Sequence, residues 1–413
     1  MSGYKPLKGV RVLELGNMVA MASAGRCFAD LGADVIKIEN TKTGDQMRTW
    51  PAQMGIPNEE DFTPVFDDLN SGKRSLSIDT NSEEGRKAIY KLLESADFFI
   101  TNVRDGGLKK KGLDWDTLHA KFPKLIMAGL TGYGHKGKEA GRPGYDTSSF
   151  WARGGFLYSQ AIKGGNPAYF PMGLGDVACG MGLVAACLMA HQAVLNGGEG
   201  DYVYTSLYGM AVWVENLMIT GDQFEKGTVH FPMSREGGSP YGIPYKCKDG
   251  YWFLPQIVKV PRDHEKYYNL IGHPELNEEE RFATRPGVME NGLGPSLIKM
   301  CEEGFAKLDS KDVVKYFEDN DLPGELLYKY NDVVTDQQAL DNGFMFEYTY
   351  PNGKKCYIAS TSVGTESMDP KGADQFIPGP LLGADTRDVL KEAGYNEEQI
   401  DALIAANVVK QHD

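Results

Sequence analysis

Apolar positions in the first third of the chain follow two alternating periods. The runs Val10–Leu15 and Asp34–Glu39 are short and apolar enough to predict buried strands. Between them, Ala20–Leu31 has helical spacing and stops before Gly32. This pattern predicts a βαβ unit, in which a helix joins two parallel strands.

The same alternation continues to about residue 130. A helix is predicted from Ser82 to about Ser95, because Ser82 is a favoured N-cap and two glutamates follow it. The strands predicted around it are Ser75–Asp79, Asp97–Asn102 and Lys124–Leu130. Strands that alternate with helices predict an α/β fold with an open, Rossmann-like parallel sheet. Such sheets bind ligands beyond the carboxyl ends of their strands.

Beyond this sheet the pattern changes twice. Gly141–Asp176 is rich in Gly, Pro, Tyr and Ser and predicts loops and short helices, and a long helix follows from Val177 to about Leu195. From about Gln223, short β-like runs and charged helical segments predict a smaller α+β domain. The tail ends in a polar helix, Asn396–Ala406. We therefore expect a large α/β domain over 1–222, a small domain over 223–337 and a C-terminal segment over 338–413.

Composition narrows the class of protein. The chain has 413 residues, of which 41% are hydrophobic, and a formal net charge of −14, which disfavours binding to nucleic acid or anionic lipid. The six cysteines are scattered and no metal-ligand spacing occurs, so we expect neither a disulfide framework nor a metal. We expect a cytoplasmic protein, because no signal-peptide pattern opens the sequence and the longest apolar run, Val177–Ala190, is short for a membrane span.

Asp176 is the most distinctive acid of the chain. It lies between glycines in the segment Pro171–Gly180, at the start of the long apolar helix. An aspartate at this place is often no more than an N-cap. The flanking glycines, however, would let a ligand approach the backbone, and the positive end of the helix would keep the carboxylate ionised, as a nucleophile requires. From the residues alone, both interpretations stay open.

Other candidate motifs are less informative. The turn Gly16–Ala20 has one glycine where a dinucleotide site needs G-x-G-x-x-G, and G-x-S-x-G of the α/β-hydrolases is absent. The pair Tyr145-Asp146 could orient a substrate or only close a turn. The pair Lys73-Arg74 and the run Lys109–Lys111 lie near predicted strand ends. They are either solvated surface or the cations that a phosphate-bearing ligand needs.

Several longer motifs follow one another along the whole chain. They are LGADVIKIE, Gly44-Asp45, Lys73-Arg74-Ser75, TNVRDGGLKKKGLDWDTL, LTGYG, GLGDVACG and GPLLGADTRDVLKEAGY. In this order they resemble the family III CoA-transferases, the family of formyl-CoA, carnitine and bile-acid CoA-transferases. The resemblance is strongest to the branch for aromatic and branched 2-hydroxy acids, such as the cinnamoyl-CoA:phenyllactate and 2-hydroxyisocaproate CoA-transferases. It implies an interlocked homodimer in which the tail returns to the large domain.

The resemblance also implies an activity and a set of site residues. Coenzyme A would pass from an acyl-CoA or enoyl-CoA to a free acid, through an aspartyl anhydride and an aspartyl-CoA thioester on Asp176. No cofactor beyond coenzyme A as a substrate is implied. The residues expected to contact the acid or acyl group are Val19, Tyr145, Asp146, Gly175, Gly237 and Gly238. The residues expected to bind coenzyme A are Lys73, Arg74, Asn102 and Lys110.

Two departures from the family pattern bear on these expectations. Val19 stands where many members have Gln, and the glycine-rich loop of the small domain is reduced to Arg235–Ser239. Related α-methylacyl-CoA racemases need two opposed acid/base groups and carry His where this chain has Tyr145. An unperturbed tyrosine, with a pKa of about 10, is a poor base at neutral pH. A racemase, a transferase for oxalate, formate, carnitine or a bile acid, and a non-catalytic CoA-binding protein are the alternatives.

Overall fold

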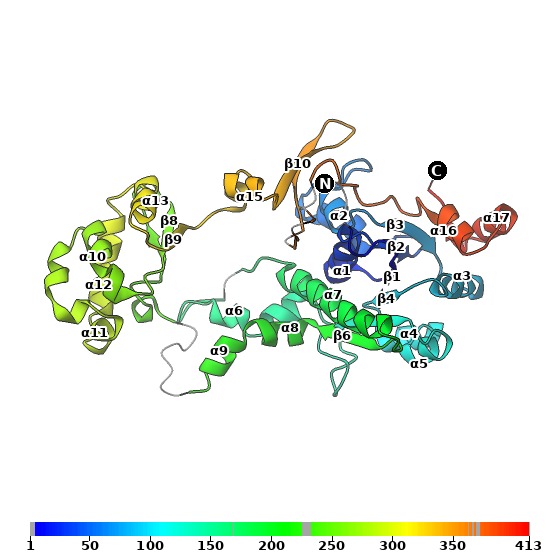
Figure 1. Ribbon diagram of the computed structural model, residues 1–413, viewed down its shortest axis with the longest axis horizontal. Coiled ribbons are helices and arrows are strands. Elements are labelled where there is room, and N and C mark those ends of the chain that lie inside the picture. The colour runs from blue at the N-terminus through cyan, green and yellow to red at the C-terminus, as the bar shows by residue number, and fades with distance from the viewer. Residues whose placement is uncertain are drawn as a thin grey trace. The chain divides into compact units, whose positions relative to one another are not determined.

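The chain divides into two compact units. A computed structural model describes residues 5–167, 169–224, 233–361, 363–365, 367–368 and 372–412. The large unit comprises Met1–Leu157, Tyr169–Thr220 and Asp336–Asp413, and the small unit comprises Tyr158–Ala168 and Gly221–Thr335 (Figure 1). The sequence pattern predicts domain boundaries after residues 222 and 337 and includes residues 158–168 in the large domain.

A seven-stranded sheet forms the centre of the large unit. Its order is β12-β3-β2-β1-β4-β5-β6, and all neighbours are parallel except β12 and β3. The strands are β1 Arg11–Leu15, β2 Asp34–Glu39, β3 Arg74–Ile78, β4 Phe98–Thr101, β5 Ile126–Thr131, β6 Tyr202–Ser206 and β12 Val409–Lys410. The chain runs from β1 through β2 to β3 and then continues on the other side of β1. The carboxyl ends of β1 and β4 therefore flank the reversal of strand order, where open α/β sheets bind ligands.

Helices cover both faces of this sheet. On one face Val12 of β1 packs into a core with α1 (Met18–Asp30) and α7 (Leu174–Leu195). On the other face Leu13 packs into a second core, formed with α3 Glu83–Leu93, α16 Thr386–Glu392 and α17 Glu397–Ala405. The predicted open, largely parallel α/β sheet is thus confirmed. Further helices are α2 Pro64–Leu69, α4 Asp105–Lys111, α5 Trp115–Lys121, α6 Phe156–Ser159, α8 Leu207–Val214, α9 Asn216–Gly221, α14 Tyr330–Val333 and α15 Gln337–Asp341.

The long apolar helix α7 begins at Leu174, three residues before the predicted start, and ends at Leu195. Its 22 residues are long and apolar enough to cross a membrane by length and composition, and 33% of its most apolar window is buried inside the chain. The expectation that the apolar run is too short for a span was therefore wrong for the complete helix. A core helix of a soluble protein gives the same signal, so length alone does not assign α7 to a membrane.

The small unit has its own core. A three-stranded antiparallel sheet, ordered β7-β8-β9, packs with helices around aromatic side chains that include Tyr245, Phe253 and Phe305. Its elements are β7 Tyr245–Lys246, β8 Trp252–Pro255, β9 Gly324–Leu326, α10 Val260–Leu270, α11 Arg285–Glu290, α12 Gly294–Phe305 and α13 Ser310–Asp319. This is the α+β composition that the sequence predicts.

The C-terminal segment belongs to the large unit. β10 (Met345–Thr349) and β11 (Lys355–Ala359) form an antiparallel hairpin, and Tyr350 on its connecting turn donates its hydroxyl to Asp67 at 2.9 Å. Farther along, the Asp385 carboxylate accepts the Ser75 N–H at 2.8 Å. β12 then extends the sheet at β3 as an antiparallel edge strand. The tail therefore completes the sheet, and this two-residue strand was not predicted.

Candidate active site

The turn between β1 and α1 lies at the reversal of strand order. Asn102, directly after β4, binds both backbone groups of Asn17 in this turn. Its amide oxygen accepts the Asn17 N–H at 3.1 Å, and its amide nitrogen donates to the Asn17 carbonyl oxygen at 2.7 Å. The Asn102 amide is thus engaged in hydrogen bonds to the turn. The predicted contact of Asn102 with coenzyme A stays a prediction. Val19 follows and borders α7, since a side chain on Gly173 would lie 3.7 Å from Val19 Cγ1.

Asp176 is the third residue of α7 rather than its N-cap. The N-cap is Gly173, which has a φ of 88° and has no side chain that could cap the helix. Asp146 binds the end of the helix from outside: Oδ2 accepts the Gly173 N–H at 2.9 Å, and Oδ1 accepts the Asp176 N–H at 3.2 Å. Asp146 opens a short π-helix, Asp146–Ala152. One carboxylate therefore lies against the helix terminus that carries the other, and no pattern in the sequence predicts this role of Asp146.

Tight packing explains why glycine occupies two positions near Asp176, Gly175 and Gly180. A Cβ on Gly175 would lie 2.5 Å from Asp146 Oδ1 and would collide with the Phe150 ring, so packing inside the large unit explains this glycine. A Cβ on Gly180 would likewise meet the Ala20 carbonyl oxygen at 2.9 Å, where α1 and α7 cross. Close approach of helices, rather than of a ligand, thus accounts for both glycines. The predicted contact of Gly175 with substrate stays a prediction.

The environment of Asp176 disfavours its charged form. Burial raises the pKa of Asp176 to about 7, and the Asp146 carboxylate adds to the shift. Burial also raises the pKa of Asp146, against the lowering effect of the backbone N–H groups that it accepts. In the part of the chain that the structure describes, neither carboxylate forms an ion pair. The expected stabilisation of charge by the helix end is outweighed, first by burial of Asp176 and then by the negative charge of Asp146, which also accepts the N–H groups of the helix end.

These two carboxyl groups can perform nucleophilic or acid/base chemistry. A carboxyl with a pKa near 7 is about half ionised at neutral pH and is more basic than an ordinary aspartate. Tyr145 precedes Asp146, and its side chain is exposed, while its N–H donates to Ser148 Oγ at 3.1 Å. Tyr145 is therefore open to a substrate, and its contact with one stays a prediction.

Lys73 is enclosed, and its predicted role in binding coenzyme A is wrong. Its side chain is fully buried, and its ammonium lies 2.8 Å from Glu14 Oε2. It also donates to the Ala22 carbonyl oxygen at 2.8 Å and to Asn70 Oδ1 at 2.9 Å. Burial lowers the pKa of Lys73 to about 8, although Glu14 opposes this shift. Lys73 precedes the amino end of β3, whereas ligands bind at carboxyl ends of strands.

Arg74 is partly exposed and is held by ion pairs, and its predicted contact with coenzyme A stays a prediction. Its guanidinium lies 2.6 Å from Asp34 Oδ2 and 2.7 Å from Glu392 Oε1, so it joins β3 to the start of β2 and the end of α16. Lys110 differs, because it is exposed near the C-terminal end of α4 and, in the described part of the chain, makes no ion pair. Its neighbour Lys109 pairs with Asp105 at 2.9 Å. Lys110 therefore remains the candidate cation for a phosphate.

The two predicted glycines of the reduced loop lie in the small unit. Ser234 Oγ accepts the Gly237 N–H at 3.1 Å, which caps a single helical turn, Arg235–Gly237. A Cβ on Gly238 would lie 2.7 Å from Ile243 Cγ2, so local packing favours glycine there. The expected contact of Gly237 and Gly238 with substrate stays a prediction.

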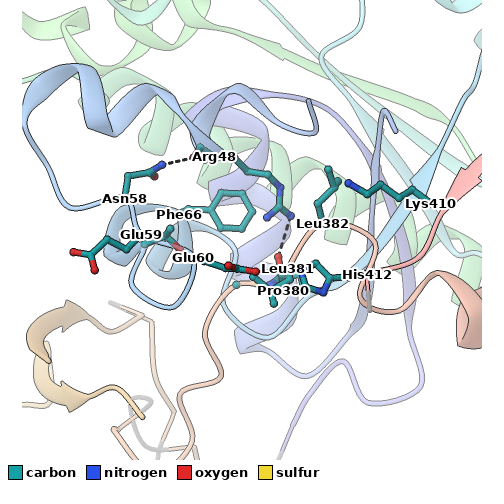
Figure 2. Close-up of a pocket in the computed structure, with 12 residues that line it drawn as sticks. Arg48, Asn58, Glu59, Glu60, Phe66, Pro380, Leu381, Leu382, Lys410 and His412 are labelled. Carbon is teal, nitrogen blue, oxygen red and sulfur yellow. Dashed lines mark hydrogen bonds and ion pairs between the residues drawn. The ribbon is translucent and has the colours of Figure 1, made fainter. Parts of the chain in front are cut away.

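A separate pocket of about 320 Å³ opens in the large unit between the segment after β2 and the tail (Figure 2). Its lining consists of Arg48, Asn58, Glu59, Glu60, Thr63, Phe66, Gly379, Pro380, Leu381, Leu382, Lys410 and His412. Arg48 is fixed there: it donates to both Glu39 oxygens at 2.8 and 2.7 Å and to the Pro380 carbonyl oxygen at 2.9 Å. The pocket holds none of the predicted site residues, and its arginine is committed to a carboxylate.

Known proteins resemble this chain over nearly its whole length. Residues 7–386 match CoA-transferase family III. The (R)-2-hydroxy-4-methylpentanoate CoA-transferase of Clostridioides difficile is 33% identical over 405 residues, which cover 98% of this chain and 99% of that protein. The cinnamoyl-CoA:phenyllactate CoA-transferase of Clostridium sporogenes is 32% identical over 398 residues, which cover 96% and 95%. The crystal structure of a CAIB/BAIF family protein from Brucella suis superposes with a TM-score of 0.79 at 27% identity, covering 94% of this chain and 99% of that one.

Proposed function

Since the protein belongs to CoA-transferase family III, we propose that it transfers coenzyme A from an acyl-CoA or enoyl-CoA to an (R)-2-hydroxy acid with an apolar or aromatic side chain. CoA-transferase activity follows from the family. The acid is supported by two relatives whose names specify 2-hydroxy-4-methylpentanoate and phenyllactate. The proposal needs no cofactor beyond coenzyme A as a substrate.

One observation carries the proposed chemistry. Asp176 lies at the start of α7, its pKa is raised to about 7 by burial and by Asp146, and no described cation pairs with it. A buried carboxylate without a counter-ion is more basic, and hence more nucleophilic, than one that is paired. Such a group suits attack on a thioester carbonyl.

The reaction that we propose proceeds through covalent intermediates on Asp176. The carboxylate attacks the thioester carbonyl of the donor, which forms a mixed anhydride and expels the CoA thiolate. The thiolate then attacks the aspartyl carbonyl, which releases the first acid and leaves an aspartyl-CoA thioester. The incoming acid attacks this thioester to form a second anhydride, and the thiolate returns to the new acyl carbonyl. Each step exchanges one acyl bond for another, and only the last step regenerates the Asp176 carboxylate.

The test uses the donor alone. Enzyme mixed with acyl-CoA is trapped with hydroxylamine or borohydride, digested and analysed by mass spectrometry. The modified peptide should contain Asp176, and Asp176→Asn protein should remain unmodified. Modification of another residue, or turnover by the Asp176→Asn variant at a near-normal rate, would contradict the proposed mechanism.

The acid is tested separately by a panel of acceptors against one donor. We expect the highest kcat/KM for 2-hydroxy acids with branched or aromatic side chains. Oxalate, formate, carnitine and a bile acid belong in the panel, because each represents an alternative within the family. A much higher kcat/KM for any of these would reject the proposed acid while leaving the transferase chemistry intact.

Racemisation is the second reaction that two carboxyl groups could support, and a racemase would be the enzyme. It would exchange the hydrogen at Cα of a 2-methylacyl-CoA with deuterium from solvent, and it would need no second acid. The exposed Tyr145, in place of histidine, disfavours it. Deuterium incorporation without acid-dependent transfer would support the racemase. A non-catalytic CoA-binding protein would show neither reaction, and loss of Asp176 would leave its binding unchanged.

We further propose that the protein is a cytoplasmic homodimer without nucleic-acid or membrane partners. Helices α7, α8 and α9 carry large apolar side chains that the chain itself leaves exposed, including Met189, Trp213 and Leu217. A second copy of the chain could cover such a surface. Light scattering at low protein concentration should give the dimer mass, and a monomer mass would contradict this assembly.

A further inference from the structure

Met18 adopts a backbone conformation that its residue type disfavours. Its φ is 67°, and among the described residues other than glycine only Asp321 and Asn407 also have a positive φ. Asp and Asn tolerate this left-handed region because their short polar side chains can bond to the nearby backbone, which methionine cannot do. The turn before α1 therefore needs a partner from another part of the chain to hold Met18.

Asp45 is that partner. Its Oδ1 accepts the Met18 N–H at 3.0 Å and the Met47 N–H at 2.9 Å. Its Oδ2 lies 2.8 Å from the Lys37 ammonium, and its own N–H donates to Glu39 Oε2 at 2.9 Å. Asp45 is 1% exposed. A buried, charged acceptor that is paired with a lysine ammonium gives a stronger and better fixed hydrogen bond than a neutral one.

Asp45 belongs to a buried network of charges. Lys37 also donates to Glu14 Oε1 at 2.7 Å, and Glu14 Oε2 lies 2.8 Å from Lys73. The four side chains are fully buried, and the two acids balance the two bases. α1 lies directly over the network, because a Cβ on Gly25 would collide with the Glu14 carboxylate. The network therefore holds Asp45 in one position under the turn.

The turn that Asp45 holds is connected to the helix of Asp176. Val19, the residue after Met18, borders Gly173 at the N-terminus of α7. Farther along, α1 and α7 approach closely at Gly180, where a Cβ would lie 2.9 Å from the Ala20 carbonyl oxygen. A shift of the turn would therefore displace its end from the terminus that carries Asp176.

We propose that Asp45 is a positioning residue for coenzyme A transfer: it holds Met18 in the left-handed region and so keeps the β1–α1 turn against the N-terminus of α7. This inference rests on the proposed role of Asp176. Because Asp45 is buried beneath the turn, its loss should slow acylation of Asp176 more than it weakens binding of acyl-CoA. The sequence pattern does not predict this role, since it shows Asp45 only as part of the Gly44-Asp45 motif.

Three variants test the role of Asp45, with acyl-CoA as the only substrate and the single-turnover rate of Asp176 acylation as the measurement. Asp45→Ala removes the bond, and Met18→Val keeps the network but introduces a β-branched residue that disfavours a positive φ. Each should slow acylation about tenfold, with a change in KM of less than about threefold. In Asp45→Ala/Met18→Gly, glycine adopts the left-handed region without the bond, so most of the rate should return.

Asp67→Asn is the matched control. Asp67 is a buried carboxylate of the large unit that accepts from Tyr350 and Thr63 rather than from the turn. This variant should melt at a lower temperature and keep the wild-type acylation rate. A folded double variant in which glycine restores no activity would overturn the proposal, since stability alone would then explain Asp45. If Asp45→Ala does not fold, the Met18→Val variant tests the proposal by itself. A wild-type acylation rate in Met18→Val would also overturn the proposal. Absence of labelling at Asp176 in the wild-type protein would instead refute the proposed function.

Discussion

The large unit contains two groups of buried acids, and they differ in whether a cation is present. Around Glu14 and Asp45, each carboxylate has a lysine ammonium within 2.8 Å. Around Asp146 and Asp176, the described residues supply backbone N–H groups but no cation. Both groups lie beside helices of the same sheet face, α1 and α7. Burial is thus common to both groups, and the balance of charge is not.

This difference decides how each group titrates. Burial by itself would raise the pKa of Asp45, but Lys37 and the hydrogen bonds of Met18 and Met47 hold it below its usual range. For Asp176 burial has no such opposition, and Asp146 adds to it, so the pKa rises to about 7. A balanced group therefore fixes a geometry, whereas an unbalanced one keeps a reactive carboxylate.

The largest effect is expected when the unbalanced acid is neutralised. Asp176→Asn is nearly isosteric, but an amide cannot form the anhydride, so transferase turnover should fall about 10⁴-fold or more. The melting temperature should not fall, because the change removes a buried charge that lacks a partner. Turnover and thermal melting are measured on the same preparation. Near-normal turnover would show that Asp176 is not the nucleophile.

Breaking the balanced group should have the opposite signature. Lys37→Met leaves Glu14 and Asp45 without their shared cation, and removal of one partner from a buried pair costs about 3–5 kcal/mol. Urea unfolding at fixed protein concentration should show the loss. Lys87→Met is the control, since Lys87 pairs with Glu83 and Glu84 on the exposed surface of α3. Equal unfolding midpoints for the two variants would mean that the buried network does not stabilise the fold.

The sequence predicted the sheet better than the site. β2 was predicted with its observed bounds, because its β-branched and apolar residues lie between clear turns. The strand β12 has two residues, and its pairing with β3 joins segments more than three hundred residues apart, so local periodicity carries no signal for it. The sequence thus specifies elements where the determining contacts are local.

Among the site residues, the same limit applies to charge. Asp176 could be identified from its glycines and from the family motifs. Lys73 was misassigned, because the sequence does not show that its partner Glu14 lies beside it, and the pairing of Arg74 with Glu392 was equally invisible in the sequence. Asp146 was expected to contact substrate, and its bond to the α7 terminus depends on a loop that returns from a different element. Whether a charge is free or paired depends on contacts between distant segments.

A smaller effect is expected at the one predicted coenzyme A cation that is free. Lys110→Ala removes a charge with no described partner, whereas Lys109→Ala removes one that pairs with Asp105. A charge-assisted phosphate contact contributes about 1.5–3 kcal/mol, so Lys110→Ala should weaken coenzyme A binding about tenfold or more. Calorimetric titration of both variants gives the comparison. Unchanged affinity in Lys110→Ala would remove this residue from the site.

The smallest and most specific effect concerns the second acid of the unbalanced pair. Asp146→Asn keeps an oxygen that can accept the Gly173 N–H but removes the negative charge beside Asp176. The pKa of Asp176 should fall from about 7, while burial, the larger cause, keeps it above the usual 3.8. Because acylation requires the ionised carboxylate, its rate rises with pH through this pKa. The acid limb of the rate profile should therefore move to lower pH in the variant, by roughly one unit or less.

The pH dependence of the free energy of unfolding tests the raised pKa of Asp176 independently of the acylation rate. A carboxyl whose pKa is raised in the folded state stabilises the fold below its unfolded pKa, and this contribution is lost as pH rises through the folded pKa. The free energy of unfolding of the wild-type protein should thus decrease between about pH 4 and pH 7 through Asp176. Asp146→Asn should reduce this decrease, and Asp176→Asn should remove the part that belongs to Asp176. If the acid limb and the stability profile of Asp146→Asn both coincide with those of the wild type, the charge of Asp146 does not influence Asp176. The difference between the two groups of acids would then be the lysine ammonium groups beside Glu14 and Asp45.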